Sequence, residues 1–201
     1  MTTIYFIRHG EYANPGQIAP YRLPGFHLTE KGVEDVTRLS DALSDEPVAA
    51  IFTSPMERTR ETANILGTPH GLVPVEDARL LEVRSPLQGK TILEIEHLGG
   101  WNWNVYDAPW FGMEGGESLD EIFARVYGIM EEKQRQYSGK TVILVTHGDP
   151  VMLIAGHYLG IPRTAEALAT LQPYVPMAGG YRLQFQDGKR ASVITSIRPI
   201  A

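Results

Sequence analysis

Short runs of apolar and β-branched residues alternate in this chain with segments whose apolar residues recur every three or four positions. The runs are typical of buried strands, and the longer spacing is typical of amphipathic helices. Strands are predicted over 2–7, 49–53, 73–75 and 141–145, and a hairpin over 181–185 and 192–197 with its turn at Asp187-Gly188. Helices are predicted over about 29–43, 54–66, 118–137 and 150–159, with one or two turns over 91–98. This alternation favours an α/β helix–sheet–helix sandwich with a mostly parallel central sheet.

Capping residues mark two of the predicted helix starts. Ser54 is followed by a proline and, three positions on, by Glu57, which is the pattern of a helix cap. Ser118 and Glu121 repeat the capping-box spacing before the longest predicted helix. We therefore expect Ser54 and Ser118 to be N-caps.

Two stretches have little periodicity. Residues 12–27 are rich in Pro, Gly and Tyr, and the pattern is weak over about 84–117. A chain of 201 residues is long enough for one well-filled core. We predict a single domain over 1–201, in which these two stretches form loops or lids.

Composition narrows the class of function. The net charge of −6 argues against a nucleic-acid partner, and no apolar run approaches the roughly 20 residues that span a bilayer. Cysteine is absent, which excludes disulfides and thiolate chemistry. The first residues enter a strand without a secretory pattern, so a cytoplasmic location is expected.

Two of the predicted strands end in a histidine followed by a glycine. Arg8 and His9 follow the first strand, and His147 follows the strand at 141–145. Arg58 lies one turn into the helix that follows a third strand. Because ligands of open α/β sheets bind at the carboxyl ends of the strands, we expect these four side chains to converge.

The residue types at this predicted edge are suited to phosphate chemistry. Arginine forks match phosphate oxygens, and a neutral imidazole is a nucleophile near pH 7. Neighbouring arginines lower the pKa of a histidine, so one imidazole is expected to attack phosphorus while the other donates a hydrogen bond. Taken singly, each histidine reads as a structural residue and Arg58 as an exposed one. Their joint occurrence in an acidic chain favours a phosphate site.

Five short motifs carry a resemblance to a known family. They are Arg8-His9-Gly10-Glu11, Leu28-Thr29-Glu30-x-Gly32, Ser54-Pro55-x-x-Arg58-x-x-x-Thr62-Ala63, Gly116-Glu117-Ser118 and Val145-Thr146-His147-Gly148. In these motifs the chain resembles the histidine phosphatase superfamily, in the branch of cofactor-dependent phosphoglycerate mutases and small broad-specificity phosphatases. The resemblance implies a three-layer phosphoglycerate mutase-like fold.

The resemblance also implies roles for individual residues. His9 is then the nucleophile that forms a phosphohistidine, and Arg8, Arg58 and His147 form the phosphate pocket with it. Glu82 aligns with the family's usual proton donor. No metal and no cofactor is expected.

The sequence departs from the family pattern near Asn14 and at Asp149. Tyr12-Ala13-Asn14-Pro15 replaces the usual continuation of the nucleophile loop, so Asn14 is offset by one. Asn14 and Gly148 are added as candidates for substrate binding. Asp149 followed by a proline is interpreted as a helix cap and a poor proton donor, so Asp149→Asn is expected to leave the chemistry mostly intact.

The tryptophans form an aromatic segment whose role is left open. Trp101, Trp103 and Trp110 lie within ten residues, beside Tyr106 and Phe111. One interpretation is a lid that excludes water and selects a bulky or aromatic phosphoester. The others are a hydrophobic cluster beneath a long loop and an interface.

The leading hypothesis is a metal-independent phosphomonoester hydrolase that acts on a small-molecule phosphoester or phosphopeptide and releases inorganic phosphate. A phosphoglycerate mutase-type transfer and a catalytically inactive phosphate-binding or scaffold protein are alternatives. A metallohydrolase using His9, His147, Glu82 and Asp149 is disfavoured because the arginines repel a cation. No nucleic acid or membrane is expected as a partner, and a homodimer is left open.

Overall fold

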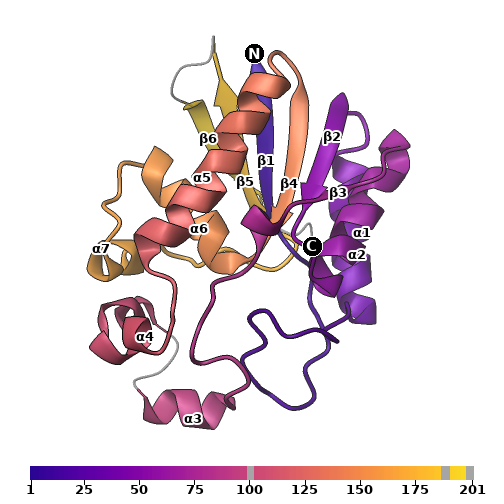
Figure 1. The fold of residues 1–201 in the computed structure, drawn as a ribbon. Helices are drawn as coiled ribbons and strands as arrows, with labels where there is room; N and C mark the ends of the chain where they lie inside the picture. The colour runs from indigo at the N-terminus through magenta and orange to yellow at the C-terminus, as the bar shows by residue number, and fades with distance from the viewer. Residues whose placement is uncertain (99–101, 187–190, 198–201) are drawn as a thin grey trace.

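The central element is a six-stranded sheet with the order β3-β2-β4-β1-β5-β6 (Figure 1). The computed structural model describes residues 1–98, 102–186 and 191–197. The strands are β1 Thr2–Arg8, β2 Val48–Thr53, β3 Val75–Glu76, β4 Thr141–Thr146, β5 Gly180–Phe185 and β6 Ala191–Ile197. β5 is antiparallel to β1 and β6, and the other pairs are parallel. The predicted α/β class with a mostly parallel sheet is confirmed.

Helices cover both faces of the sheet, which gives the predicted three layers (Figure 1). α1 (Glu30–Ala42) and α2 (Glu57–Gly67) lie on one face, and α5 (Leu119–Gln136) and α6 (Gly148–Tyr158) lie on the other. The remaining helical segments are α3 Ile92–His97, α4 Pro109–Met113, α7 Ala165–Ala169 and the 3-10 turns η1 Thr68–His70, η2 Ala78–Leu80 and η3 Trp103–Asp107.

The two central strands are apolar on both faces. In β1, Ile4 and Phe6 pack into the core beneath α5 and α6, while Tyr5 and Ile7 pack beneath α1 and α2. β4 alternates in the same way, and all its residues are buried. A parallel strand covered on both sides reads as a continuous apolar run, which is why the sequence pattern located β1 and β4. The residues that follow these strands are therefore held by a rigid core.

The segments with weak periodicity lie beyond the carboxyl ends of the central strands. Figure 1 shows α3, α4 and the loop over 12–27 there, away from the helical layers. Isolated bridges join Tyr12 to Leu28 and Ile18 to Thr91. These segments surround the sheet edge where the candidate residues were predicted. The predicted hairpin strands are present as β5 and β6, whereas the turn at 187–188 and Trp101 lie outside the described residues.

The capping prediction holds at one helix and is wrong at two. Ser118 and Glu121 form a capping box at the start of α5. α2 begins only at Glu57, because the hydroxyl of Ser54 instead contacts His147. α6 begins at Gly148, with His147 at the cap position, so Asp149 lies inside the first turn and is not the cap.

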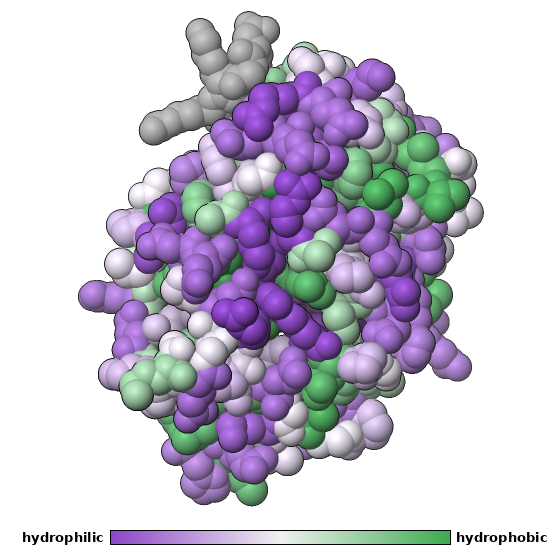
Figure 2. All heavy atoms as spheres, in the orientation of Figure 1, coloured by the Kyte–Doolittle hydropathy of each residue, from purple (hydrophilic) through white to green (hydrophobic). Residues whose placement is uncertain are grey.

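The surface shown in Figure 2 is mostly polar, with apolar residues scattered among the polar ones. Within the described part of the chain, no helix combines the length and the hydropathy needed to cross a membrane.

Candidate active site

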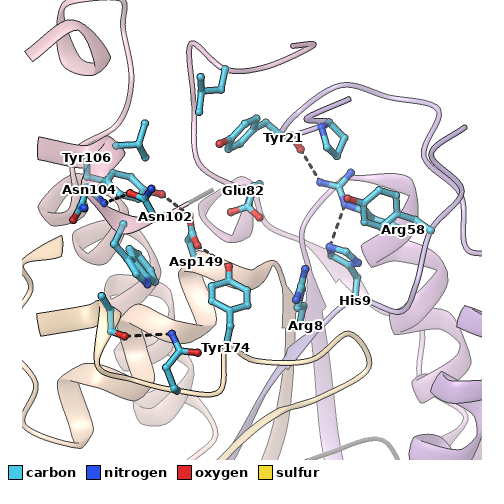
Figure 3. Close-up of a pocket in the computed structure, with 17 residues that line it drawn as sticks. Arg8, His9, Tyr21, Arg58, Glu82, Asn102, Asn104, Tyr106, Asp149 and Tyr174 are labelled. Atoms are coloured by element: carbon cyan, nitrogen blue, oxygen red, sulfur yellow. Dashed lines mark hydrogen bonds between the residues drawn. The ribbon is translucent and has the colours of Figure 1, made fainter. Parts of the chain in front are cut away.

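The pairing of β1 with β4 brings the two histidines together. Arg8 is paired with Thr146 at the ends of the two parallel strands, so the next residues, His9 and His147, are neighbours. Their ring centroids are 5.2 Å apart, and the side chains are buried. Arg58, from the start of α2, bonds to both rings. The sheet and α2 thus bring together four of the residues predicted from the sequence (Figure 3).

The unprotonated ring nitrogen of His9 faces the guanidinium of Arg58. Its Nδ1 lies 2.8 Å from the carbonyl oxygen of Gly10, which only accepts hydrogen bonds, so Nδ1 carries the proton. Nε2 then accepts a bond from Arg58 Nε at 3.3 Å. Burial, followed by the charges of Arg58 and Arg8, holds the pKa of His9 well below its usual value. His9 is therefore a neutral imidazole with Nε2 available for nucleophilic attack.

His147 has the opposite tautomer. Its Nδ1 lies 3.2 Å from Arg58 Nη2, which only donates, so the proton is on Nε2 and points to Ser54 Oγ at 2.9 Å. Burial and the nearby Arg58 charge lower the pKa of His147 well below its usual value. The Ser54 hydroxyl thus orients the second imidazole. This is why Ser54 does not cap α2.

Arg8 and Arg58 each have one buried N–H group without a hydrogen-bond partner in the part of the chain that the structure describes. Arg58 is 1% exposed, and its Nη2 donates to the carbonyl oxygen of Tyr21 at 2.6 Å. Arg8 donates from Nη1 to the carbonyl oxygen of Val175 at 2.7 Å. Arg58 Nη1 and Arg8 Nε are buried, and neither has a hydrogen-bond partner among the described residues. Buried donors of this kind require a partner, and a bound oxyanion supplies one.

Glu82 follows η2 and lines the same cavity as His9. Its Oε1 accepts from the backbone N–H of Val83 at 3.0 Å, and its Oε2 lies 4.0 Å from His147 Nδ1. Burial raises the pKa of Glu82 to about 7, and the Asp149 carboxylate adds to this, against the Val83 bond and the two arginines. A carboxyl group with this pKa can both give and take a proton near neutral pH.

Glu117 holds the backbone on which Glu82 sits. Its carboxylate accepts from Arg22 at 2.7 Å, from Arg125 at 2.8 Å and from the backbone N–H of Arg84 at 2.8 Å. Arg22 and Arg125 also donate to the carbonyl oxygen of Glu82, at 2.7 and 3.2 Å. The Gly-Glu-Ser motif of the sequence therefore positions the segment that carries Glu82.

Arg8, His9, Arg58 and Glu82 line one cavity of about 450 Å³. Its wall also includes five aromatic residues, together with apolar, amide and acidic ones. The aromatic rings come from Tyr12, Tyr21, Trp103, Tyr106 and Tyr174. Trp103 stacks on Tyr106 with centroids 5.7 Å apart, whereas Trp110 packs against the small cluster of Ala19, Leu87 and Ile95. The aromatic segment therefore contributes both to the cavity wall and to a cluster beneath the loop.

Three candidates from the sequence, Asn14, His147 and Gly148, are not among the residues that line the cavity. The amide of Asn14 closes its own loop, because Nδ2 donates to the Ile18 carbonyl oxygen at 2.8 Å and Oδ1 accepts from the Ile18 N–H at 3.2 Å. Gly148 acts indirectly, since a Cβ there would lie 2.1 Å from the Tyr174 hydroxyl oxygen. Glycine is needed at 148 to make room for the Tyr174 ring.

Sequence reasoning missed Tyr21 and Tyr174 at the cavity, and it named Tyr106 only as part of the aromatic segment. Tyr21 contributes the carbonyl that accepts from Arg58, and Tyr106 and Tyr174 both donate their hydroxyls to Asp149. All three come from irregular segments, where periodicity carries no information. The one signal in the sequence for these tyrosines was their partner Asp149, directly after His147-Gly148. Asp149 was interpreted as a helix cap.

The described residues contain no group of three or more His, Cys, Asp or Glu side chains placed to hold a metal ion. The metal-free chemistry expected from the sequence stays a prediction.

The fold, which here places paired histidines and arginines at the carboxyl edge of its sheet, is shared by a class of α/β proteins. The structure of Bacillus stearothermophilus YhfR matches with a TM-score of 0.81 and 28% identity, covering 96% of each chain. A probable phosphoglycerate mutase GpmB of Photorhabdus laumondii is 30% identical over 172 residues, which are 83% of this chain and 79% of that protein. Phosphoserine phosphatase 1 of Hydrogenobacter thermophilus is 28% identical, over 80% of this chain and 78% of that protein. The family model of the histidine phosphatase superfamily (branch 1) matches residues 4–195, and the chain belongs to this family.

Replacement of Glu117 is expected to loosen the Glu82 segment. Glu117→Gln leaves Arg22 and Arg125 without their carboxylate partner, so the free energy of unfolding should fall by about 3 kcal/mol. Catalytic turnover should fall as well, because Glu82 loses its fixed position. Urea unfolding and steady-state kinetics measure the two effects, with the exposed Glu114→Gln as the control. Glu117→Gln behaving like Glu114→Gln would contradict the positioning role.

Proposed function

We propose that the chain is a phosphomonoester hydrolase that forms a phosphohistidine on Nε2 of His9. The observation that carries the proposal is the buried, neutral His9 ring, whose unprotonated Nε2 faces the guanidinium of Arg58. The unpartnered donors of Arg58 and Arg8 lie beside it. A nucleophile and a cradle for an oxyanion therefore occupy the same end of the cavity.

The first step transfers the phosphoryl group to the enzyme. His9 Nε2 attacks phosphorus, the bond from phosphorus to the leaving oxygen breaks, and protonated Glu82 gives its proton to that oxygen. Arg8 and Arg58 hold the non-bridging oxygens as charge shifts toward the leaving group. The raised pKa of Glu82 supplies the acid near neutral pH.

The second step releases phosphate. Ionised Glu82 takes a proton from a water molecule, the water oxygen attacks phosphorus, and the bond from His9 Nε2 to phosphorus breaks. Inorganic phosphate leaves, and both residues return to their starting states. The two arginines supply the positive field that magnesium supplies in other phosphoryl-transfer enzymes, so we propose a metal-independent reaction.

The charges of the cavity favour a leaving group without a second negative charge. Among the described residues that line the cavity, Arg8 and Arg58 are the only arginines, and lysine is absent. The other charged groups are the carboxyls of Glu82 and Asp149, in a wall of aromatic, apolar and amide side chains. We therefore propose small phosphomonoesters with an uncharged aromatic or apolar leaving group, for which a cavity of about 450 Å³ is large enough. A carboxylate-bearing phosphoglycerate fits this wall less well, so hydrolysis is preferred to mutase transfer.

The curated relatives include a protein named as a phosphatase and one named as a probable mutase, which supports an active enzyme over a scaffold. The cytoplasmic location and the homodimer considered from the sequence stay predictions.

Covalent labelling tests the nucleophile. Wild-type protein mixed with a ³²P-labelled aryl phosphate and quenched in alkali should retain label that acid removes, and excess chelator should leave turnover unchanged. His9→Ala should lose the label and about 10⁴-fold or more of the turnover, because its nucleophile is gone. The exposed His97→Ala is the control and should label normally. Label that persists in His9→Ala, or that resists acid, would refute the assignment.

A comparison of two leaving groups tests whether Glu82 is the general acid. In Glu82→Gln, kcat/KM for an alkyl phosphate should fall about 10²-fold or more, whereas that for p-nitrophenyl phosphate should fall far less, since nitrophenolate leaves without a proton. Because Glu82 must be protonated and its pKa is about 7, wild-type kcat/KM for the alkyl ester should decline as pH rises through that value. Equal losses on both substrates would contradict a donor role.

A matched pair of esters tests the proposed selectivity. Carboxyphenyl phosphate differs from phenyl phosphate by one negative charge. Its kcat/KM should be at most about one tenth of that for phenyl phosphate, because its carboxylate meets carboxyls and no further cation in the cavity. With 3-phosphoglycerate, slow phosphate release is expected and no 2-phosphoglycerate. Preference for the carboxylated ester, or isomerisation of phosphoglycerate, would favour the mutase.

A further inference from the structure

Asp149 is the point at which two walls of the cavity are joined. Its Oδ2 accepts from the hydroxyl of Tyr106 at 2.5 Å, and its Oδ1 accepts from the hydroxyl of Tyr174 at 2.6 Å. Tyr106 belongs to η3 and Tyr174 to the segment after α7, whereas Asp149 lies in the first turn of α6. Three segments distant in the sequence therefore meet at this carboxylate.

The ring of Tyr174 also packs against Arg8, one of the two arginines proposed to hold phosphate. The ring of Tyr174 lies 5.3 Å from the guanidinium carbon of Arg8, and the next residue, Val175, accepts from Arg8 Nη1 at 2.7 Å. The ring occupies the space that opens because residue 148 is a glycine. Asp149 thus fixes a ring that itself packs on Arg8.

The other tyrosine connects Asp149 to the aromatic wall. Tyr106 stacks on Trp103, which also lies 6.4 Å from Tyr174 between ring centroids. Both tyrosines are largely buried, and proximity to Asp149 helps to keep their hydroxyls protonated. The carboxylate therefore holds the wall against which the leaving group would lie.

Asp149 faces Glu82 across the same cavity. In Figure 3, Glu82 lies between Asp149 and the pair of His9 and Arg58. A second carboxylate nearby makes ionisation of Glu82 less favourable. The arginines at the other end of the cavity act in the opposite direction. The protonation of Glu82 is set by the balance between these charges.

The groups that face Glu82 come from every segment around the cavity. The cations and imidazoles are Arg8, Arg58, His9 and His147. The hydroxyl groups belong to Tyr12, Tyr21, Tyr106 and Tyr174. Arg22 and Arg125 bond to the backbone carbonyl of Glu82 rather than to its carboxyl. Among these charged neighbours, the one carboxylate the structure describes is Asp149.

We propose that Asp149, clamped by the hydroxyls of Tyr106 and Tyr174, is a positioning residue that keeps the proton on Glu82 and fixes the aromatic wall beside it. Asp149 transfers no proton itself. The proton that reaches the leaving oxygen comes from Glu82, and Asp149 acts through its charge and its two hydrogen bonds. This inference rests on the proposed function and replaces the interpretation of Asp149 as a helix cap.

The pH dependence of Asp149→Asn tests the charge. Asparagine keeps the size of the side chain and removes the negative charge, so Glu82 should ionise at lower pH. The alkaline decline of kcat/KM for an alkyl phosphate should move down by about half a pH unit or more, with several-fold loss near pH 7.5. The ionisation of the substrate is common to both enzymes and cancels in the comparison. Asp107→Asn, an exposed change within η3, should leave the decline where it is.

A double variant separates a positioning role from a structural one. In the Glu82→Gln background, Asp149→Asn should cause no further shift of the profile, because the group through which it acts is gone. Tyr106→Phe keeps the charge and should raise KM without moving the decline. If Asp149→Asn does not fold, Asp149→Ser serves as the second variant.

The outcomes distinguish this inference from the function it rests on. A wild-type protein that neither labels on His9 nor releases phosphate overturns the proposed function. A wild-type phosphatase whose profile is unmoved by Asp149→Asn, even if its melting temperature falls, overturns the inference alone. An unchanged KM in Tyr106→Phe overturns the part that concerns the wall.

Discussion

The site depends on one guanidinium that is almost completely removed from water. Arg58 is bonded to both imidazoles and to a backbone carbonyl, and no carboxylate within the described chain lies at ion-pair distance from it. A buried cation without a counter-ion is costly, so the arrangement is stable only where neutral partners surround it and an anion can enter. Burial is the main reason that His9 and His147 stay unprotonated, and the same charge adds to it. The buried guanidinium therefore contributes both to a neutral imidazole at His9 and to an affinity for oxyanions.

The distribution of charge along the cavity follows from this constraint. In Figure 3, Arg8 and Arg58 lie on one side of Glu82, and Asp149 lies on the other side, beside Tyr106 and Tyr174. A phosphate ester matches this arrangement. Its negatively charged phosphoryl group suits the arginines, and its leaving oxygen, which needs a proton, suits a protonated carboxyl. In the proposed reaction, anion binding and proton donation are thus separated, because Arg8 and Arg58 lie on other segments than Glu82. Glu117 holds the segment that carries Glu82 through Arg22, Arg125 and the backbone, whereas Asp149 acts on the Glu82 carboxyl through its charge.

Sequence alone was sufficient for the parts of the site that regular structure positions. β1 and β4 are continuous apolar runs, and the residues after them were placed at one edge by the rule for parallel sheets. Arg58 followed from the helix after β2. The capping box at Ser118 was also correct, because both of its partners lie within four residues. These features depend on local periodicity or on contacts that the sheet topology fixes.

The errors concern residues whose partners are distant in sequence. Ser54 has a cap pattern, but its hydroxyl bonds to His147, 93 residues away. Asp149 was interpreted as a cap, yet its partners are tyrosines 43 and 25 residues away, in segments without periodicity. Asn14 was assigned to the substrate although its amide is used to close a four-residue turn. A side chain that suits a local motif takes a long-range partner when burial makes that partner necessary, and no local pattern reveals this.

The protonation of His9 tests the account most directly. Nitrogen-15 NMR of histidine-labelled protein distinguishes the two neutral tautomers from the imidazolium. The account predicts that at pH 6.5, the ordinary pKa of a histidine, His9 is neutral, with the proton on Nδ1 and none on Nε2. An imidazolium at that pH, or a proton on Nε2, would contradict the claim that burial and Arg58 prepare this ring for attack on phosphorus.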